Sequence, residues 1–255
     1  MSTLLSTAGV INLNETSLFD LIKEDSPWAY WTLEEGEGSM LDHSGNGYHL
    51  EDFVVTGTGS GSGIILRNQP PIITTNKSVY IDGYYIGSDS YNNDLASEFN
   101  GNKPLSILLT VKPEIFSGYL IHLGDFNVFG HQGLTIILEQ SESSFRIKIE
   151  MFYAGYWYSQ ITPYIPTANA PIIQIGFCKI PDVGSFITIN GNKIKDGADI
   201  NVPMMFGTSS KIAVGNVIPA GSTTRIKGNM QHVAVFNKII PETRFLEYAR
   251  TSKLY

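Results

Sequence analysis

The stretch WAYWTLEEGEGSMLDHSGNGYHL, residues 28–50, decides how this chain folds. In residues 29–33 aromatic and aliphatic side chains recur with a period close to two, which predicts a buried β-strand. Residues 34–47 that follow are acidic and rich in glycine, and their Ser-Gly-Asn-Gly end tolerates positive φ in tight turns. The stretch therefore predicts a strand that runs into an ordered loop.

The composition of the whole chain favours many short strands. Its 255 residues include 25 glycines and 12 prolines beside many β-branched and aromatic side chains, a mixture typical of strands joined by turns. A chain of this length can bury a sizeable core as one large β-domain. The formal net charge of −7, without any basic run, argues against a nucleic-acid-binding surface.

Apolar segments continue along the chain at the spacing of an antiparallel sandwich. They cover residues 78–83, 104–112, 119–124, 134–139 and 145–153. Helical signals are confined to residues 17–24, where Ser17 can cap a helix and Asp20 can return the bond, and to residues 241–250. We therefore predict an all-β fold, a jelly-roll β-sandwich of two antiparallel sheets with a short N-terminal helix or arm.

Motifs at both ends of the chain point to a family of such folds. The first are YWTLEEG at residues 30–36 and DHSGNG at residues 42–47. The later ones are FITING at 186–191, IAVGN at 212–216 and GNMQHVAVFN at 228–237. In this order they resemble the laminin-G-like, concanavalin A-like lectin/glucanase domains, from about residue 26 to the C-terminus. The resemblance implies a concanavalin A-like jelly roll.

The segment DSPWAYWTL, residues 25–33, resembles the start of laminin-G-like domains in bacteriophage tail and capsid-associated proteins. This resemblance implies a virion protein without enzyme activity that binds cell-surface glycan or a host receptor and so mediates host attachment. Two alternatives stay open. One is a structural virion or assembly protein whose sandwich mainly contacts other proteins, and the other is a glycosidase or its sugar-binding domain.

The domain organisation that we expect is an N-terminal arm, residues 1–25, followed by one jelly-roll domain, residues 26–255. The short helix in the arm either packs across the sandwich edge or anchors the domain to other virion proteins, and we expect a homo-oligomer. The N-terminus lacks the basic and apolar regions of a signal peptide, and no apolar run is long enough to cross a bilayer. We therefore expect a virion protein that is made in the host cytoplasm.

The sequence nominates no catalytic residues. Glucanases on this fold carry Glu-x-Asp-x-x-Glu on one strand, and no such spacing occurs here. We expect Glu34 and Glu35 to point to opposite strand faces, with Glu37 in a solvated glycine loop. The five histidines show no zinc spacing. The single cysteine, Cys178, lies in an apolar segment and is interpreted as a buried thiol.

Calcium is the ion that the opening loop would suit. Asp42, the carbonyl groups near Ser44 and the side chain of Asn46 bring several hard oxygens to one tight loop. The resemblance implies a calcium site that an acid in the closing strand completes, and the equivalent position here is Gln231. Because a neutral amide lowers the charge of such a site, an empty, hydrogen-bonded loop stays open as the alternative.

Two aromatic clusters are the candidate ligand sites. Sugar-binding sites set flat rings against C–H faces and use nearby amides or carboxylates for hydroxyl groups. One cluster contains Tyr156 and Trp157, beside a turn at residues 154–155. The other contains Tyr84, Tyr85, Asp89, Tyr91 and Asn92. Core packing is the alternative for Trp157, whereas Trp28 and Trp31 are expected in the core.

Overall fold

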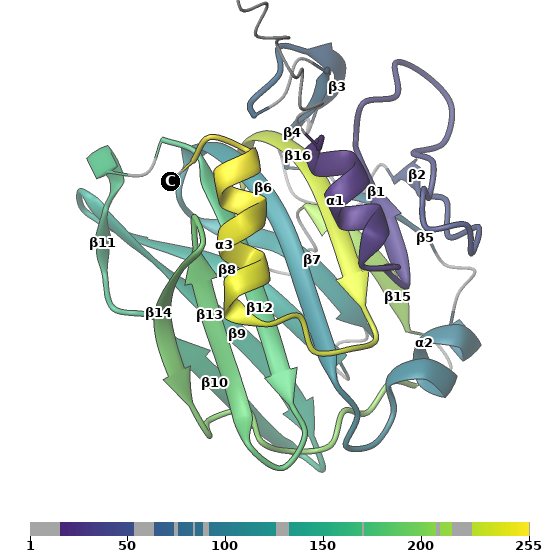
Figure 1. Cartoon of the computed structure of the whole chain (residues 1–255), viewed down its shortest axis with the longest axis vertical. Coiled ribbons are helices and arrows are strands. Elements are labelled where there is room, and N and C mark those ends of the chain that lie inside the picture. The colour runs from purple at the N-terminus through teal and green to yellow at the C-terminus, as the bar shows by residue number, and fades with distance from the viewer. Residues whose placement is uncertain are drawn as a thin grey trace, which may run out of the picture.

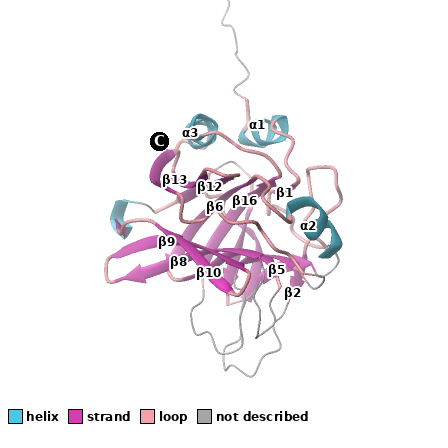
Figure 2. Ribbon diagram, turned by 90° about the horizontal axis from the view of Figure 1, so that it is seen from below, coloured by secondary structure: helices cyan, strands magenta, loops and turns pink. Residues whose placement is uncertain are grey.

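Two antiparallel sheets, packed face to face, form the layers of this computed structural model (Figure 1). The structure describes residues 16–53, 64–73, 76–83, 85–88, 92–125, 133–169, 171–207, 210–215 and 226–254. Of Phe53, Asn92, Asn93 and Asn169 only the backbone is described. Figure 2 shows the layers edge-on, with α1 and α3 on the outer side of one sheet.

The sheet that carries these helices, sheet A, has eight strands among the described residues, in the order β14-β13-β12-β6-β16-β4-β3, with β1 also paired to β16. Its strands are β1 (Ala29–Trp31), β3 (Ile64–Gln69), β4 (Ser78–Asp82), β6 (Leu105–Ile115), β12 (Ile173–Ile180), β13 (Gly184–Ile189), β14 (Asn192–Gly197) and β16 (Lys227–Phe236). Every strand pair is antiparallel.

The opposite sheet, sheet B, has the order β10-β9-β8-β7-β15-β5-β2, with β11 also paired to β9, and is likewise antiparallel throughout its described part. Its strands are β2 (Glu51–Phe53), β5 (Tyr85–Ser88), β7 (Gly118–Gly124), β8 (Gly133–Ser141), β9 (Ser144–Tyr153), β10 (Tyr156–Ile161), β11 (Ile165–Pro166) and β15 (Lys211–Gly215). The prediction of a two-sheet antiparallel sandwich is therefore confirmed.

Helices are short, as predicted. They are α1 (Leu18–Glu24), α2 (Asn92–Phe99), α3 (Glu242–Thr251) and the 3₁₀ turn η1 (Thr167–Asn169). Ser17 caps α1, because its hydroxyl accepts a bond from the amide of Asp20 at 3.1 Å and donates to the Asp20 carboxylate at 2.6 Å. The α2 helix was not predicted, since its segment NNDLASEF has the composition of a loop at its start. None of the described helices combines the length and apolarity that crossing a bilayer requires.

The hydrophobic core has two parts. The larger lies between the sheets and includes Trp31, Leu109 and Phe177, all fully buried. The smaller lies between the outer face of sheet A and the helices, and it includes Leu21 of α1 and Phe245 of α3. Because β12 and the first part of β6, residues 105–111, are covered on both faces, their residues are buried continuously rather than alternately.

Three sequence predictions about core residues are confirmed. Trp28 and Trp31 are buried, and Trp31 also donates from its indole nitrogen to the Tyr48 carbonyl at 2.6 Å. Cys178 is a buried free thiol on the outer face of sheet A, and burial raises its pKa.

The strand that opens the decisive stretch is shorter than predicted. It ends at Trp31 because Leu33 has φ +60°, a left-handed conformation that breaks the pleat. The expectation that Glu34 and Glu35 lie on opposite faces of a strand is therefore wrong, since both stand in the loop after β1.

Candidate functional site

The first candidate site is the aromatic hairpin, residues 152–158, where β9 turns into β10. Its two-residue turn has φ +52° at Ala154 and φ +87° at Gly155, which is the conformation of tight hairpin turns that match strand twist. The register sets Trp157 opposite Phe152 and Tyr156 opposite Tyr153. Because paired residues share a face, the turn sets Phe152 and Trp157 on the outer face of sheet B, and Tyr153 and Tyr156 on the opposite face.

The rings of this hairpin face solvent. Tyr156 is 69% exposed and Trp157 is 52% exposed, so the core-packing interpretation of Trp157 is wrong. Phe152 meets Trp157 edge to face, with ring centroids 5.2 Å apart, and so supports the indole from the neighbouring strand. Because β10 is an end strand of sheet B in the described structure, one side of the hairpin has no neighbouring strand.

A ladder of charges continues from the hairpin along β9. Arg146, Lys148 and Glu150 alternate with buried residues and therefore share the outer face with Phe152. Lys148 lies 2.5 Å from Glu150 and 3.7 Å from Glu139, and these carboxylates raise its pKa although burial opposes this. Sequence reasoning missed these residues, although their spacing of two along a strand was a visible signal.

Tyr85, from the second predicted cluster, also lies on the outer face of sheet B. A Cβ atom at Gly87 would lie 2.9 Å from a ring carbon of Tyr85 and 2.6 Å from the Ile212 carbonyl, so only glycine fits beneath the ring. Five strand steps separate β5 from β10, or about 24 Å. Tyr85 and Trp157 therefore do not belong to one small site.

The rest of the second cluster is described only in part. Tyr84, Asp89 and Tyr91 lie outside the described residues, and Asn92 begins α2 with only its backbone described. Whether these residues form a sugar site with Tyr85 stays a prediction.

The opening loop is organised by Asp42, which is buried. Its Oδ1 accepts from the amides of Tyr30 and Ser44, both at 2.9 Å. Its Oδ2 accepts from the Ser44 hydroxyl at 2.7 Å and from the amide of Tyr48 at 3.0 Å. Asn46 donates from its side chain to the Trp28 carbonyl at 2.8 Å. Both carboxylate oxygens of Asp42 are thus used by protein donors.

Gln231 makes its described contacts elsewhere. Its Oε1 accepts from the amides of Ile72 and Ile73, both at 3.3 Å, and its Nε2 donates to the Lys77 carbonyl at 3.0 Å and to Glu34 at 3.2 Å. Within the described part of the chain, no group of three or more His, Cys, Asp or Glu side chains has the arrangement of a metal site. Calcium at Asp42, Asn46 and Gln231 stays a prediction, and the hydrogen bonds of Asp42 favour the loop without an ion.

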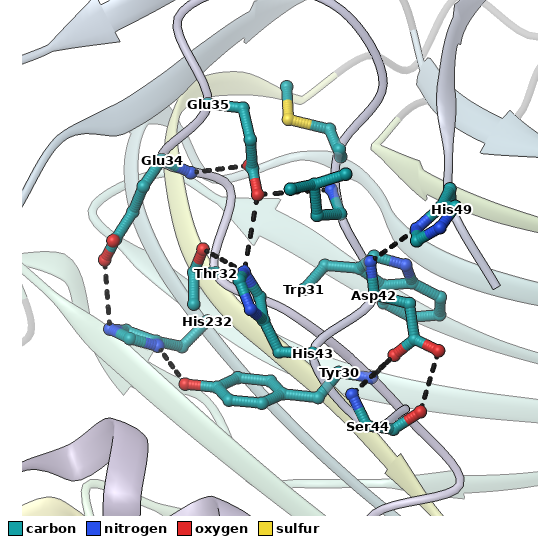
Figure 3. A network of polar contacts seen from close by, with 12 residues as sticks. Tyr30, Trp31, Thr32, Glu34, Glu35, Asp42, His43, Ser44, His49 and His232 are labelled. Atoms are coloured by element: carbon teal, nitrogen blue, oxygen red, sulfur yellow. Dashed lines mark hydrogen bonds and ion pairs between the residues drawn. The ribbon is translucent and has the colours of Figure 1, made fainter. Parts of the chain in front are cut away.

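A buried polar network lies beside this loop (Figure 3). The Tyr30 hydroxyl lies 2.7 Å from His232 Nδ1, and His232 Nε2 lies 3.8 Å from Glu34. Burial, and secondarily His43, lowers the pKa of His232 to about 3, while burial raises the pKa values of Tyr30 and Glu34. His232 is 1% exposed, so this group is a neutral part of the core rather than a base that meets a substrate.

His43 and Glu35 form the outer part of the same network. His43 Nε2 lies 3.4 Å from Glu35, whose other interactions include a bond from the amide of Leu41 at 3.1 Å. The ring of Phe19 in α1 meets that of His43 edge to face at 5.4 Å. These contacts attach the loop to α1 and place both carboxylates, Glu34 and Glu35, in structural roles.

Comparison with known proteins identifies similar structures. Domain 4 of an extracellular arabinanase from Geobacillus stearothermophilus, in complex with arabinotriose, superposes with a TM-score of 0.56 and 17% identity, over 87% of this chain and 97% of that one. The binding domain of botulinum neurotoxin serotype G superposes with a TM-score of 0.61 and 14% identity, over 88% of this chain and 50% of that one.

A third similar structure is the serotype D ligand binding domain of botulinum neurotoxin in complex with N-acetylneuraminic acid. Its TM-score is 0.58 and its identity 13%, over 92% of this chain and 52% of that one. This chain thus spans about half of each of these two neurotoxin domains. No protein-family model and no curated protein sequence matches the chain. At these identities the comparisons show the fold, and this chain shares its β-sandwich with domains of an arabinanase and of neurotoxins.

Proposed function

We propose that this protein is a carbohydrate-binding module without enzyme activity, and that it holds glycan at the aromatic hairpin. The observation that carries the proposal is the exposure of Trp157 on a rigid two-residue turn, with Phe152 packed against the indole on the outer face of sheet B. Tyr156 is also exposed, but it points to the opposite face. Exposed rings held by a scaffold stack on the C–H faces of sugars at little cost in side-chain entropy.

The charge ladder beside the rings supplies groups for sugar hydroxyls. Glu150 shares the outer face of β9 with Phe152 and lies two residues away, about 7 Å along the strand. Its ion pair with Lys148 orients both a strong acceptor and a strong donor next to the rings. This combination of ring, carboxylate and amine suits a neutral, polyhydroxylated ligand.

The similar structures support a saccharide as the ligand. Arabinotriose occupies the arabinanase domain, and N-acetylneuraminic acid occupies a neurotoxin domain. Both are saccharides held by domains that share this fold.

We further propose that this protein belongs to a virion and attaches a bacteriophage to its host. The support for this part is the resemblance of residues 25–33 to phage tail and capsid-associated domains. A shallow single site binds weakly, so attachment would need several copies held together. Light scattering of the purified protein tests this part, and a monomer at all concentrations would contradict it.

Glycan-array binding followed by calorimetry tests the ligand site. Trp157→Ala should weaken binding of the best array ligand by about tenfold or more, the size of a lost stacking contact. The matched control is Tyr164→Ala, because Tyr164 is exposed but stacks on Arg146, about 20 Å along β9 from Phe152. Tyr164→Ala should bind like wild type.

Three results would overturn the proposal. Unchanged binding by Trp157→Ala would remove the hairpin site. Release of reducing sugar from the array ligand would assign a glycosidase. No binding to any glycan on the array, together with stable trimers or larger ring-shaped oligomers, would favour a structural assembly protein.

A further inference from the structure

A groove of about 420 Å³ lies on the outer face of sheet A, at the end away from α3. Its volume falls within the range of about 300–1,000 Å³ that is typical of small-molecule sites. Figure 1 shows β3 above the upper ends of α1 and α3. The groove belongs neither to the hairpin nor to the opening loop.

The floor of the groove is set by strand register. Leu66 of β3 pairs with Tyr80 of β4, and Asn229 of β16 pairs both with Tyr80 and with Lys112 of β6. Val79 and Met230, which are next in sequence to Tyr80 and Asn229, lie in the central core. The side chains of Tyr80 and Asn229 therefore point to the outer face of the sheet. The Tyr80 phenol, the Asn229 amide and the Lys112 amine thus lie side by side across three neighbouring strands, β4, β16 and β6.

One wall of the groove is pinned by buried groups. The segment that contains Pro70 and Ile72 lines the groove, and Gln231, which is fully buried, accepts from the Ile72 amide. Ser78 donates to the Pro70 carbonyl at 2.7 Å and accepts from the Asn229 side-chain nitrogen at 3.1 Å. The wall is therefore held in place without a ligand, as pre-organised binding sites are.

The charges of the groove are balanced. Lys227 lies 3.6 Å from both Asp82 and Glu114, and Tyr80 donates to Glu114 at 3.0 Å. Together with Lys112, the lining has two positive and two negative side chains. Ile64 and Leu66, 43% and 44% exposed, add apolar surface at the rim. An ionic ligand would meet a like charge on either side, whereas a neutral ligand with an apolar face and hydroxyl groups would meet partners for both.

We propose that this groove is a second binding site, for one or two rings of a neutral oligosaccharide. The Tyr80 ring and the exposed side chains of β3 contact the C–H faces, and Asn229, Lys227 and Glu114 bind the hydroxyl groups. The site is independent of the hairpin, so it stands or falls separately from the function proposed above.

The test is a nitrogen-15 NMR titration with arabinotriose, maltotriose and cellotriose as probes. For at least one probe, amide shifts should change at residues 64–66, 80–82 and 227–229, in wild type and equally in Trp157→Ala. Lys227→Met and Asn229→Ala should each raise the dissociation constant at this site by about tenfold. Lys193→Ala is the matched control, because Lys193 is as exposed as Lys227 and also bridges two carboxylates, Asp196 and Glu242.

The outcomes separate the two sites. Shifts confined to the hairpin, or no shift at the groove up to about 50 mM of any probe, would overturn the second site, since this exceeds the millimolar range of weak binding. Loss of the groove shifts in Trp157→Ala would also overturn it. The amide shifts of the wild-type protein test the groove site without any groove variant. The test therefore still works if Asn229→Ala is unstable.

Discussion

Asp42 is the residue on which the ordered loop depends most. It accepts four hydrogen bonds, three of them from the backbone amides of Tyr30, Ser44 and Tyr48. Asp42→Ala should lower the free energy of unfolding by about 3 kcal/mol, because buried donors left unpaired cost more than the bonds themselves contribute. Urea denaturation measures this loss.

A control for this substitution stands in the same loop. Glu37 is exposed, so Glu37→Ala should change stability by less than about 0.5 kcal/mol. Equal stability of Asp42→Ala and wild type would contradict the structural role. If the loop binds calcium, a chelator should destabilise wild type but not Asp42→Ala, and this comparison decides the untested ion site.

His232 makes stability depend on pH. Its folded pKa of about 3 lies below the ordinary value of 6.5, so the unfolded chain binds the proton more tightly. The stabilising contribution is therefore complete above about pH 6.5 and is lost as pH falls toward 3, at up to about 1.4 kcal/mol per pH unit. Glu34, whose pKa is raised by burial, opposes this loss at the acidic end because its protonated form is favoured in the folded state.

His232→Gln isolates this effect, because glutamine can still bond to the Tyr30 hydroxyl but does not titrate. Urea midpoints between pH 4 and 8 should fall less steeply below pH 6.5 in the variant than in wild type. Parallel curves would show that His232 is already neutral in the unfolded chain or charged in the folded one, and either would contradict the burial argument.

At the scale of elements, α1 is part of the packed domain. Leu18, Leu21 and Ile22 are buried in the smaller core, and each stabilises the fold by about 1.5–3 kcal/mol. Arg244 of α3 holds the end of α1 through Asp25 at 2.5 Å and through the Leu21 carbonyl at 3.1 Å. The interpretation of this helix as packed against the sandwich agrees with these contacts, and residues 1–15 lie outside the described residues.

Arg244→Ala should therefore release α1 without unfolding the sheets. Amide hydrogen exchange should speed up at residues 18–25, since the Leu21 carbonyl loses the guanidinium and the Asp25 carboxylate keeps only the Tyr248 hydroxyl as a donor. Lys193→Ala, which breaks only exposed ion pairs, should leave this exchange unchanged. Slow exchange at residues 18–25 in Arg244→Ala would mean that apolar packing alone holds the helix.

For the aromatic hairpin, the sequence could predict the turn but not the exposure of its rings. The turn at residues 154–155 was predictable because a glycine between two aromatic runs favours a tight hairpin. The exposure of Trp157 was not, because alternation along a strand tells which side chains share a face but not whether another layer covers it.

At the scale of the molecule, the sandwich was predictable because each strand carries its own alternation and turn residues. The groove was not, because its residues come from positions 64 to 229 and meet only through the order of β3, β4, β16 and β6. Gln231 illustrates the difference. Its place in the closing strand suggested a metal ligand, whereas tertiary contacts make it the acceptor for a segment 158 residues earlier.

The net charge of the molecule leads to the last prediction, on the class of glycan. With a formal charge of −7, the protein repels anionic ligands over the distance that salt leaves unscreened. A neutral sugar that stacks on Trp157 and meets balanced ion pairs has no net electrostatic attraction or repulsion for salt to screen. Its affinity should therefore change by less than about twofold between about 0.05 M and 0.5 M salt, whereas a sialylated analogue should bind more tightly as salt screens the repulsion. Calorimetry of matched neutral and sialylated oligosaccharides measures both slopes. A neutral ligand whose affinity falls tenfold over this range would show that the charged pair of Lys148 and Glu150, rather than the rings, dominates binding.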